Sequence, residues 1–116
     1  MPQQRELVTD TIASAGTQSS AINTGPHRIA GLIMPAGWDA ANITFQMTPD
    51  GTNWYDVYND AATPAIMTLT GPVAAKYYAF MTVWWALEAL GTVRLVASAA
   101  QNGGARILTL VLVKRA

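Results

Sequence analysis

The segment Asn42-Ile43-Thr44-Phe45-Gln46-Met47-Thr48 alternates polar and apolar side chains without interruption, and this alternation decides the fold class. A period of two places its three large apolar side chains on one face of a half-buried β-strand. Pro49-Asp50-Gly51-Thr52 follows and predicts a turn, because Pro presets φ and Asp-Gly accepts a positive φ. The aromatic and β-branched segment 53–58 supplies a second strand, so the sequence predicts a β-hairpin.

Short β-prone runs recur on both sides of this hairpin, separated by Gly and Pro at intervals of about 8–12 residues. That spacing is typical of a sandwich or barrel. We therefore predict an all-β fold, a single-domain antiparallel β-sandwich (jelly roll) of about eight strands. The further strands are expected at 7–13, 18–24, 28–34, 65–70, 76–81, 92–97 and 106–114.

Three features of these segments indicate where they lie in the sheets. Gly31 interrupts the strand at 28–34 and predicts a bulge or a close backbone approach. The segments 7–13 and 18–24 are polar, which is protective at a sheet edge. The segment 106–114 is apolar on both faces, so we expect it in the middle of a sheet or with its outer face covered by a partner.

The segment 73–90 fits two interpretations. Its large apolar residues recur at spacings of three and four, and Gly91 follows in the position of a helix C-cap, which favours a helix of about four turns. The aromatic and β-branched residues up to position 85 are mediocre helix formers, whereas those at 86–90 are good ones. We expect a strand at 76–81 followed by one short helix near 82–90.

Length and charge limit the classes of function. The 116 residues are enough for one domain, 1–116, with residues 1–20 as a candidate extended N-terminal arm. Seven Lys and Arg balance seven Asp and Glu, and only 12% of residues are charged, which disfavours a nucleic-acid binder and a polybasic membrane-surface protein. The most apolar stretch, 77–90, contains Glu88 and is shorter than the roughly 20 residues that span a bilayer. We therefore expect no nucleic acid and no membrane among the partners.

The reactive side chains argue against an enzyme. The sequence has no Cys and one histidine, His27, so thiol catalysis and Cys-based zinc sites are excluded. Asp50, Asp56 and Asp60 match no calcium-loop spacing and are better interpreted as solvated turn residues. We expect no catalytic residue, no metal and no cofactor.

Adjacent aromatic residues are the strongest indication of a binding surface. Neighbouring side chains on a strand point to opposite sides, so the pairs at 77–78 and 84–85 cannot enter one core together. Exposed Trp and Tyr are typical of protein interfaces. Burial by sheet curvature is a competing interpretation, and a sugar-stacking platform using Trp38, Trp54 or Trp84 is a third. The predicted partner-interface residues are Trp38, Tyr77, Tyr78, Trp84, Trp85, Leu87, Leu110 and Leu112.

Two ordered motifs resemble small virion proteins of tailed bacteriophages. The first is His27-Arg28-Ile29-Ala30-Gly31-Leu32-Ile33-Met34-Pro35-Ala36-Gly37-Trp38. The second is Ile43-Thr44-Phe45-Gln46-Met47-Thr48-Pro49-Asp50-Gly51-Thr52-Asn53-Trp54-Tyr55-Asp56-Val57-Tyr58. The segments 92–95 and 106–111 are similar to the closing strands of that group, and the resemblance covers about residues 10–116.

The resemblance implies a jelly-roll or discoidin-like β-sandwich that acts as a capsid decoration (cement) protein. It implies the major capsid protein as partner, self-association with a homotrimer favoured, and a place on the capsid surface after synthesis in the host bacterial cytoplasm. Residues 82–90 are apolar where related sequences have a more polar turn, which favours docking onto a shell or a neighbouring subunit. A carbohydrate-binding or adaptor module of a phage tail tip, fibre or vertex spike is the alternative function.

Overall fold

The chain folds into two antiparallel β-sheets packed face to face. The computed structural model describes residues 3–60, 62–80, 87 and 90–115. These residues are nearly all in strands and connecting loops, and the predicted all-β sandwich is confirmed. The strands are β1 (Gln3–Ile12), β2 (Ile22–Asn23), β3 (Arg28–Ile33), β4 (Ile43–Thr48), β5 (Tyr55–Asp56), β6 (Thr68–Leu69), β7 (Tyr77–Ala79), β8 (Thr92–Ala97) and β9 (Arg106–Arg115).

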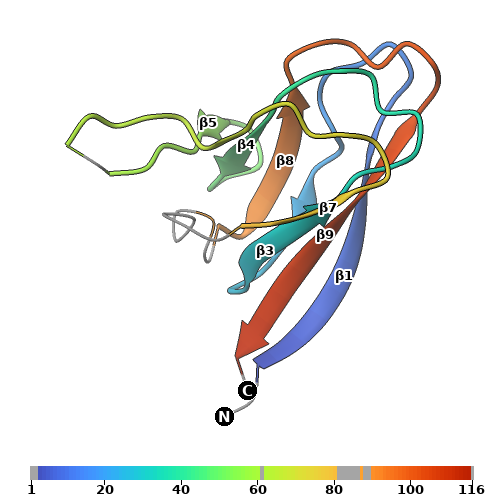
Figure 1. Cartoon of the computed structure of the whole chain (residues 1–116). Coiled ribbons are helices and arrows are strands. Elements are labelled where there is room, and N and C mark those ends of the chain that lie inside the picture. Colours follow the sequence, from blue (N-terminus) through green and yellow to red (C-terminus); the bar gives the residue numbers. More distant parts are fainter. Residues whose placement is uncertain (1–2, 61, 81–86, 88–89, 116) are drawn as a thin grey trace.

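The strand order is that of a jelly roll (Figure 1). The first sheet has the order β1-β9-β3-β7, and the second sheet has the order β2-β8-β4-β5, with β6 also paired to β4. The pairs are nested, because β1 pairs with β9, β2 with β8, β3 with β7, and β4 with β5 and β6. A long antiparallel ribbon folded over on itself produces this nesting.

Strand register confirms the local predictions made from turn and glycine chemistry. The hairpin pairs Gln46 with Asp56 and Met47 with Tyr55, and Gly51 in its turn has φ of 81°. The pairing of β3 with β9 shifts between Ile29 and Gly31, so the predicted bulge is present. β9 lies between β1 and β3, as expected of a strand that is apolar on both faces.

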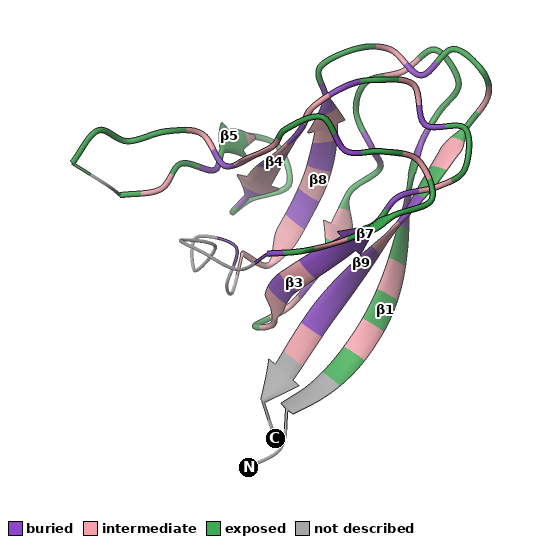
Figure 2. Ribbon diagram, in the orientation of Figure 1, coloured by how far each residue is buried: buried purple, intermediate pink, exposed green. Residues whose placement is uncertain are grey.

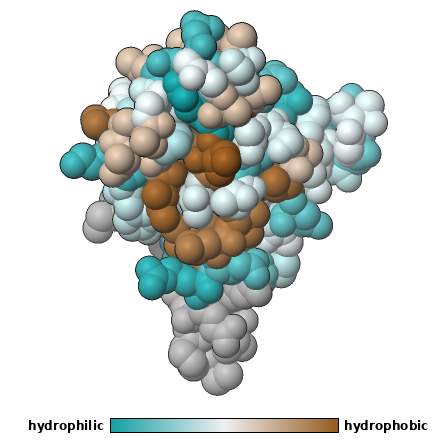
Figure 3. Space-filling view, turned by 90° about the vertical axis from the view of Figure 1, so that its right-hand side faces the viewer, coloured by the Kyte–Doolittle hydropathy of each residue, from teal (hydrophilic) through white to brown (hydrophobic). Residues whose placement is uncertain are grey.

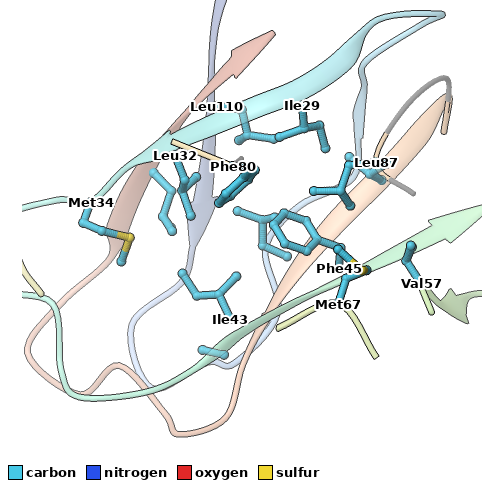
Figure 4. Packing of buried hydrophobic residues seen from close by; sticks show 14 of the residues in the cluster. Ile29, Leu32, Met34, Ile43, Phe45, Val57, Met67, Phe80, Leu87 and Leu110 are labelled. Carbon is cyan, nitrogen blue, oxygen red and sulfur yellow. The ribbon is translucent and has the colours of Figure 1, made fainter. Parts of the chain in front are cut away.

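The core lies between the two sheets and draws on both (Figures 2 and 4). Phe45 of β4 meets Phe80, which follows β7, edge to face with ring centroids 5.8 Å apart and planes at 85°. Alternate residues of β9 also point into this core. The largest fully buried side chains are Ile12, Ile29, Leu32, Met34, Ile43, Phe45, Leu87, Leu95, Leu108, Leu110, Leu112 and Gln101.

Four of the strands are shorter than the sequence predicted. The segments expected at 18–24, 53–58, 65–70 and 76–81 contain only two or three ladder residues each, namely β2, β5, β6 and β7. These strands end their sheets or, for β6, pair over two residues, so only one side of each is held by a partner. A strand that is hydrogen-bonded on one side only is easily interrupted. It therefore ends where the chain turns toward the other sheet.

Two further expectations are affected by the structure. Gln3–Ile12 lies within the segment 1–20 that was expected to be an arm, but these residues pair with β9 over their whole length and form an integral strand. The short helix predicted near 82–90, with Trp84 and Trp85, lies outside the described residues apart from Leu87 and Leu90. In the part of the chain that the structure describes, no helix is long and apolar enough to cross a membrane.

Candidate functional site

The outer face of the first sheet, meaning the side turned away from the core, is the candidate site. Residues paired directly across strands share a face of the sheet. The register sets Leu7 beside Val111, Val111 beside Gly31, and Gly31 beside Ala79 on this side. The apolar or aromatic members are Leu7, Ile33, Tyr77, Ala79, Ile107, Val111 and Val113.

This face exposes several large apolar side chains. Leu7 is 61% exposed, Tyr77 51% and Ile107 56%. In Figure 3, which views the molecule from the side of β1 and β9, hydrophobic atoms surround a paler centre. Scattered exposed apolar residues are normal on a monomer, but a contiguous patch on a sheet face indicates a contact surface.

Tyr77 lies across the middle of the face because Gly31 leaves room for its ring. A Cβ placed on Gly31 would come within 2.5 Å of the Tyr77 Oη and 2.6 Å of its Cε1. The approach at Gly31 is made by the Tyr77 side chain, whereas backbone was the neighbour predicted from the sequence. Beside the ring lies a hollow of about 380 Å³, lined by Arg5, Leu7, Ile33, Tyr77 and Val111. Val111 is only 3% exposed although it faces outward.

The charge on this face has one sign. Arg5 of β1 and Arg28 of β3 lie on it, each in register with Val113. None of the described strand residues that the register places on this face is Asp or Glu. The face therefore suits a partner surface that is apolar at its centre and carries carboxylates at its rim.

The outer face of the second sheet is polar and already hydrogen-bonded. Arg94 Nε donates to Gln46 Oε1 at 2.7 Å, and Gln46 Nε2 donates to Asp56 Oδ1 at 2.9 Å. The Arg94 guanidinium also lies over the Trp54 ring, 4.2 Å from its centroid. Because these groups satisfy one another, this face has less need of a partner than the first sheet.

The structure separates the predicted partner-interface residues into core, surface and undescribed positions. Trp38, Leu87, Leu110 and Leu112 are 8%, 0%, 0% and 1% exposed, so they belong to the core and their assignment to an interface was wrong. Leu110 and Leu112 occupy the inward-facing positions of β9, which the doubly apolar sequence could not distinguish from the outward ones. Trp84 and Trp85 lie outside the described residues.

Tyr77 and Tyr78 point to opposite sides of the sheet, as the sequence predicts for neighbours on a strand. Tyr78 packs against the core, and its Oη accepts a hydrogen bond from the Val73 N–H at 2.7 Å. Tyr77 alone of this pair is exposed on the candidate face. Sequence reasoning missed Leu7, Ile33, Ile107 and Val111, because only the pairing of β1, β9 and β3 brings them together.

The acidic residues serve local structure. Asp10 is 2% exposed, and its carboxylate accepts hydrogen bonds from Ser19 Oγ at 2.6 Å, Ser20 Oγ at 2.8 Å and the Thr11 N–H at 3.0 Å. Burial raises the pKa of Asp10, and these hydrogen bonds offset part of that rise. Ser19 Oγ also accepts from the Leu95 N–H at 2.7 Å, which ties β1 to the second sheet.

Asp50 organises the hairpin turn, as expected of a turn residue. Its carboxylate accepts from the backbone N–H groups of Asn53 and Thr52, each at 2.8 Å, and from Asn53 Nδ2 at 2.8 Å. These bonds hold the pKa of Asp50 well below its usual range. Within the described residues no group of three or more His, Cys, Asp or Glu is placed to hold a metal ion.

These features define a jelly-roll β-sandwich with one apolar outer face. Its fold is similar to that of the SPBc2 prophage-derived protein YomS, whose crystal structure matches 98% of this chain and 96% of that chain with a TM-score of 0.58. The two sequences are 10% identical, so the likeness concerns the fold alone. No protein-family model and no curated protein sequence matches the chain.

Proposed function

We propose that this chain is a structural virion protein of a tailed bacteriophage, and that it is a capsid decoration protein that binds and stabilises the icosahedral shell. The motifs at 27–38 and 43–58 support this proposal through their resemblance to small phage virion proteins. The fold likeness to a prophage-derived protein agrees with it. In this proposal the chain is made in the host bacterial cytoplasm, acts without catalysis or cofactor, and ends on the capsid surface.

The observation that carries the proposal is the apolar outer face of the first sheet. A decoration protein has to cover apolar surface on a shell many times over, through a broad and mostly uncharged contact. Tyr77 lies in the middle of this face, beside Ile33 in the register, and is the kind of residue that dominates such contacts. The partner is the major capsid protein, through a surface with a carboxylate at its rim that faces Arg5.

The first experiment is to count this chain in purified particles by quantitative mass spectrometry against the major capsid protein. A number of copies comparable to that of the shell subunit is expected. A few copies per particle would contradict a decoration role and favour a tail, fibre or vertex component.

The second experiment compares two matched tyrosine variants in rebinding to particles stripped of this chain. Tyr77 and Tyr55 are 51% and 55% exposed, but Tyr55 belongs to the second sheet. Tyr77→Ala is expected to weaken binding roughly tenfold or more, and Tyr55→Ala to leave it unchanged. Equal effects of the two variants would mean that the first sheet is not the contact.

A carbohydrate-binding module is the alternative function, and the position of Trp54 indicates where its sugar site would lie. Of the three Trp residues considered as sugar platforms, Trp38 is buried and Trp84 lies outside the described residues. Trp54 is half-buried against Arg94, which is hydrogen-bonded to Gln46. Planar aromatic surface next to polar groups suits a sugar ring. A saturable change of Trp fluorescence on glycan titration, lost in Trp54→Ala, would favour this module over the decoration role.

A further inference from the structure

β1 is the longest edge strand among the described residues, and one of its two edges has no partner strand along most of its length. β1 is ten residues long and stands at the end of the first sheet, whereas β2, β5 and β7 at the other sheet ends have two or three residues each. Proteins usually protect long edges with proline, bulges or charged side chains, lysine above all. β1 carries Arg5, Glu6 and Asp10, but it has no Pro, no Lys and no shift in its pairing with β9, so its backbone is regular enough to accept a further strand in a register that opposes no like charges.

One hydrogen bond shows which residues present their backbone groups to that edge. The Ser20 N–H donates to the Thr11 C=O at 3.2 Å from the side opposite β9, and the Thr11 N–H bonds to Asp10 Oδ1 rather than to β9. Backbone groups alternate in direction along a strand. The odd-numbered residues therefore face the free edge. Because Thr11 is already engaged by Ser20, the available positions are Gln3, Arg5, Leu7 and Thr9.

We propose that two copies of this chain pair antiparallel through β1, about a two-fold axis at Leu7, so that the first sheets of both copies become one continuous sheet. Arg5, Leu7 and Thr9 are symmetric about Leu7, and Gln3 lies at the end of the pairing, opposite Thr11. In this register the two Leu7 residues exchange backbone hydrogen bonds, and Arg5 does the same with Thr9 of the second copy.

Charge and hydrogen bonding select this register over its neighbours. An axis at Arg5 places two arginines opposite each other, and an axis one residue to either side of Leu7 opposes Glu6 with Glu6 or with Asp10. An axis at Thr9 opposes Leu7 with Thr11, whose carbonyl is already bonded to Ser20, whereas the Leu7 axis brings Thr11 only opposite Gln3 at the end of the strand. The Leu7 register opposes no like charges, and it places two exposed leucine side chains together on the outer face.

The pairing goes beyond shell binding and is tested on the isolated chain. Sedimentation equilibrium of the full-length protein is expected to show a dimer. Leu7→Pro removes an N–H that faces the free edge and leaves the ladder with β9 intact, so it is expected to raise the dimer dissociation constant at least roughly tenfold. Ile107→Lys is the matched control, because Ile107 lies on the same outer face but away from the free edge, and it is expected to leave dimerisation unchanged.

Cysteine cross-linking fixes the register, since the chain has no cysteine of its own. Leu7→Cys is expected to form a disulfide-linked dimer on oxidation, because directly paired Cα atoms lie about 5.5 Å apart. Thr9→Cys is expected not to cross-link, because its two copies would be roughly 14 Å apart in this register. Far-UV circular dichroism of each variant confirms that it is folded.

Four results would overturn the proposal. The first is a monomer at every concentration tested, and the second is a trimer, the state that the resemblance implies. The third is cross-linking through position 9 instead of position 7. The fourth, loss of dimer in Ile107→Lys together with Leu7→Pro, would assign the contact to the outer face rather than the edge. Rebinding to the shell is measured in a separate experiment, so the dimer proposal and the shell-binding proposal can be contradicted independently.

Discussion

At the scale of single residues, Gly31 and Tyr77 explain how an aromatic side chain comes to lie on a sheet face. The ring occupies the space that any Cβ at position 31 would need. Glycine weakens a strand interior, and here the bulge and the close ring share that one position. The centre of the candidate face is therefore a property of two residues on neighbouring strands.

Gly31→Ala is expected to displace the Tyr77 ring and to lower the free energy of unfolding by about 1 kcal/mol, because the ring is partly exposed and is able to swing away. In a Tyr77→Ala background, Gly31→Ala is expected to lower the free energy of unfolding much less. Denaturant unfolding of the four proteins in this double-mutant cycle measures the coupling. Additive effects would show that the ring and the glycine are independent.

Asp10 shows how a buried carboxylate links stability to pH. Its pKa is raised in the folded state, so the native protein holds this proton to higher pH than the unfolded chain does. Stability contributed by Asp10 is therefore greatest at low pH and falls as pH rises through the interval above the ordinary value of 3.8. Asp10→Asn has no such titration. The difference in unfolding free energy, wild type minus variant, is expected to decrease from about pH 3 to about pH 6. An increase over that range would contradict the raised pKa.

At the scale of elements, the hairpin of β4 and β5 depends on one turn residue. Asp50 accepts several hydrogen bonds from its own turn, and Gly51 supplies the positive φ. The Pro-Asp-Gly turn could be predicted from the sequence because the contacts that form it are local.

Asp50→Ala is expected to lower stability at neutral pH and to matter less in acid. The lowered pKa means that the stabilising charged form is present above the ordinary value of 3.8 and is lost as pH falls. This trend is opposite to that of Asp10. Asp60→Ala, at an exposed position, controls for the loss of a charge. Thermal unfolding of both variants at about pH 7 and about pH 3 makes the comparison. A loss at Asp50 that does not shrink in acid would mean that its charge is not what holds the turn.

β1 and β9 show what the pattern along a strand leaves undecided. The polar character of β1 predicted an edge and the apolar character of β9 predicted an interior position, and both predictions are confirmed. Which face of β9 enters the core was not decided, because leucine and valine alternate along it with nearly equal hydrophobicity. The interface assignment of Leu110 and Leu112 failed for this reason.

At the scale of the whole molecule, one core joins both sheets. Phe45 and Phe80 come from opposite sheets and meet at its centre (Figure 4). The nested strand pairs mean that neither sheet is made of a continuous piece of chain, since β1 and β9 come from opposite ends of it. The sheets are therefore expected to fold and unfold together.

Phe45→Ala is expected to lower the free energy of unfolding by roughly 3–5 kcal/mol, since it removes a fully buried ring and leaves a cavity. Denaturation followed by Trp fluorescence and by far-UV circular dichroism should give a single coincident transition. Thr44→Ala, on the outer face of the same strand, is the control and is expected to change stability little. Two separated transitions would contradict a shared core.

The features that could be predicted from the sequence alone arise from contacts between residues close together in the chain. The alternation in 42–48 and the Pro-Asp-Gly turn predicted the hairpin, and Gly31 predicted the bulge. The spacing of the turn residues predicted about eight short strands, and this number of strands predicted a β-sandwich.

Tertiary structure decided which residues meet on a surface. The candidate face joins β1, β9, β3 and β7, whose positions in the sequence lie up to about a hundred residues apart, and the two-residue period is the same whichever face is buried. Trp38 and Leu87 illustrate the limit, since an aromatic or apolar residue in a loop has no period that tells whether it turns inward. Only the packing of one sheet on the other fixes that choice, because burial is a property of the assembled layers.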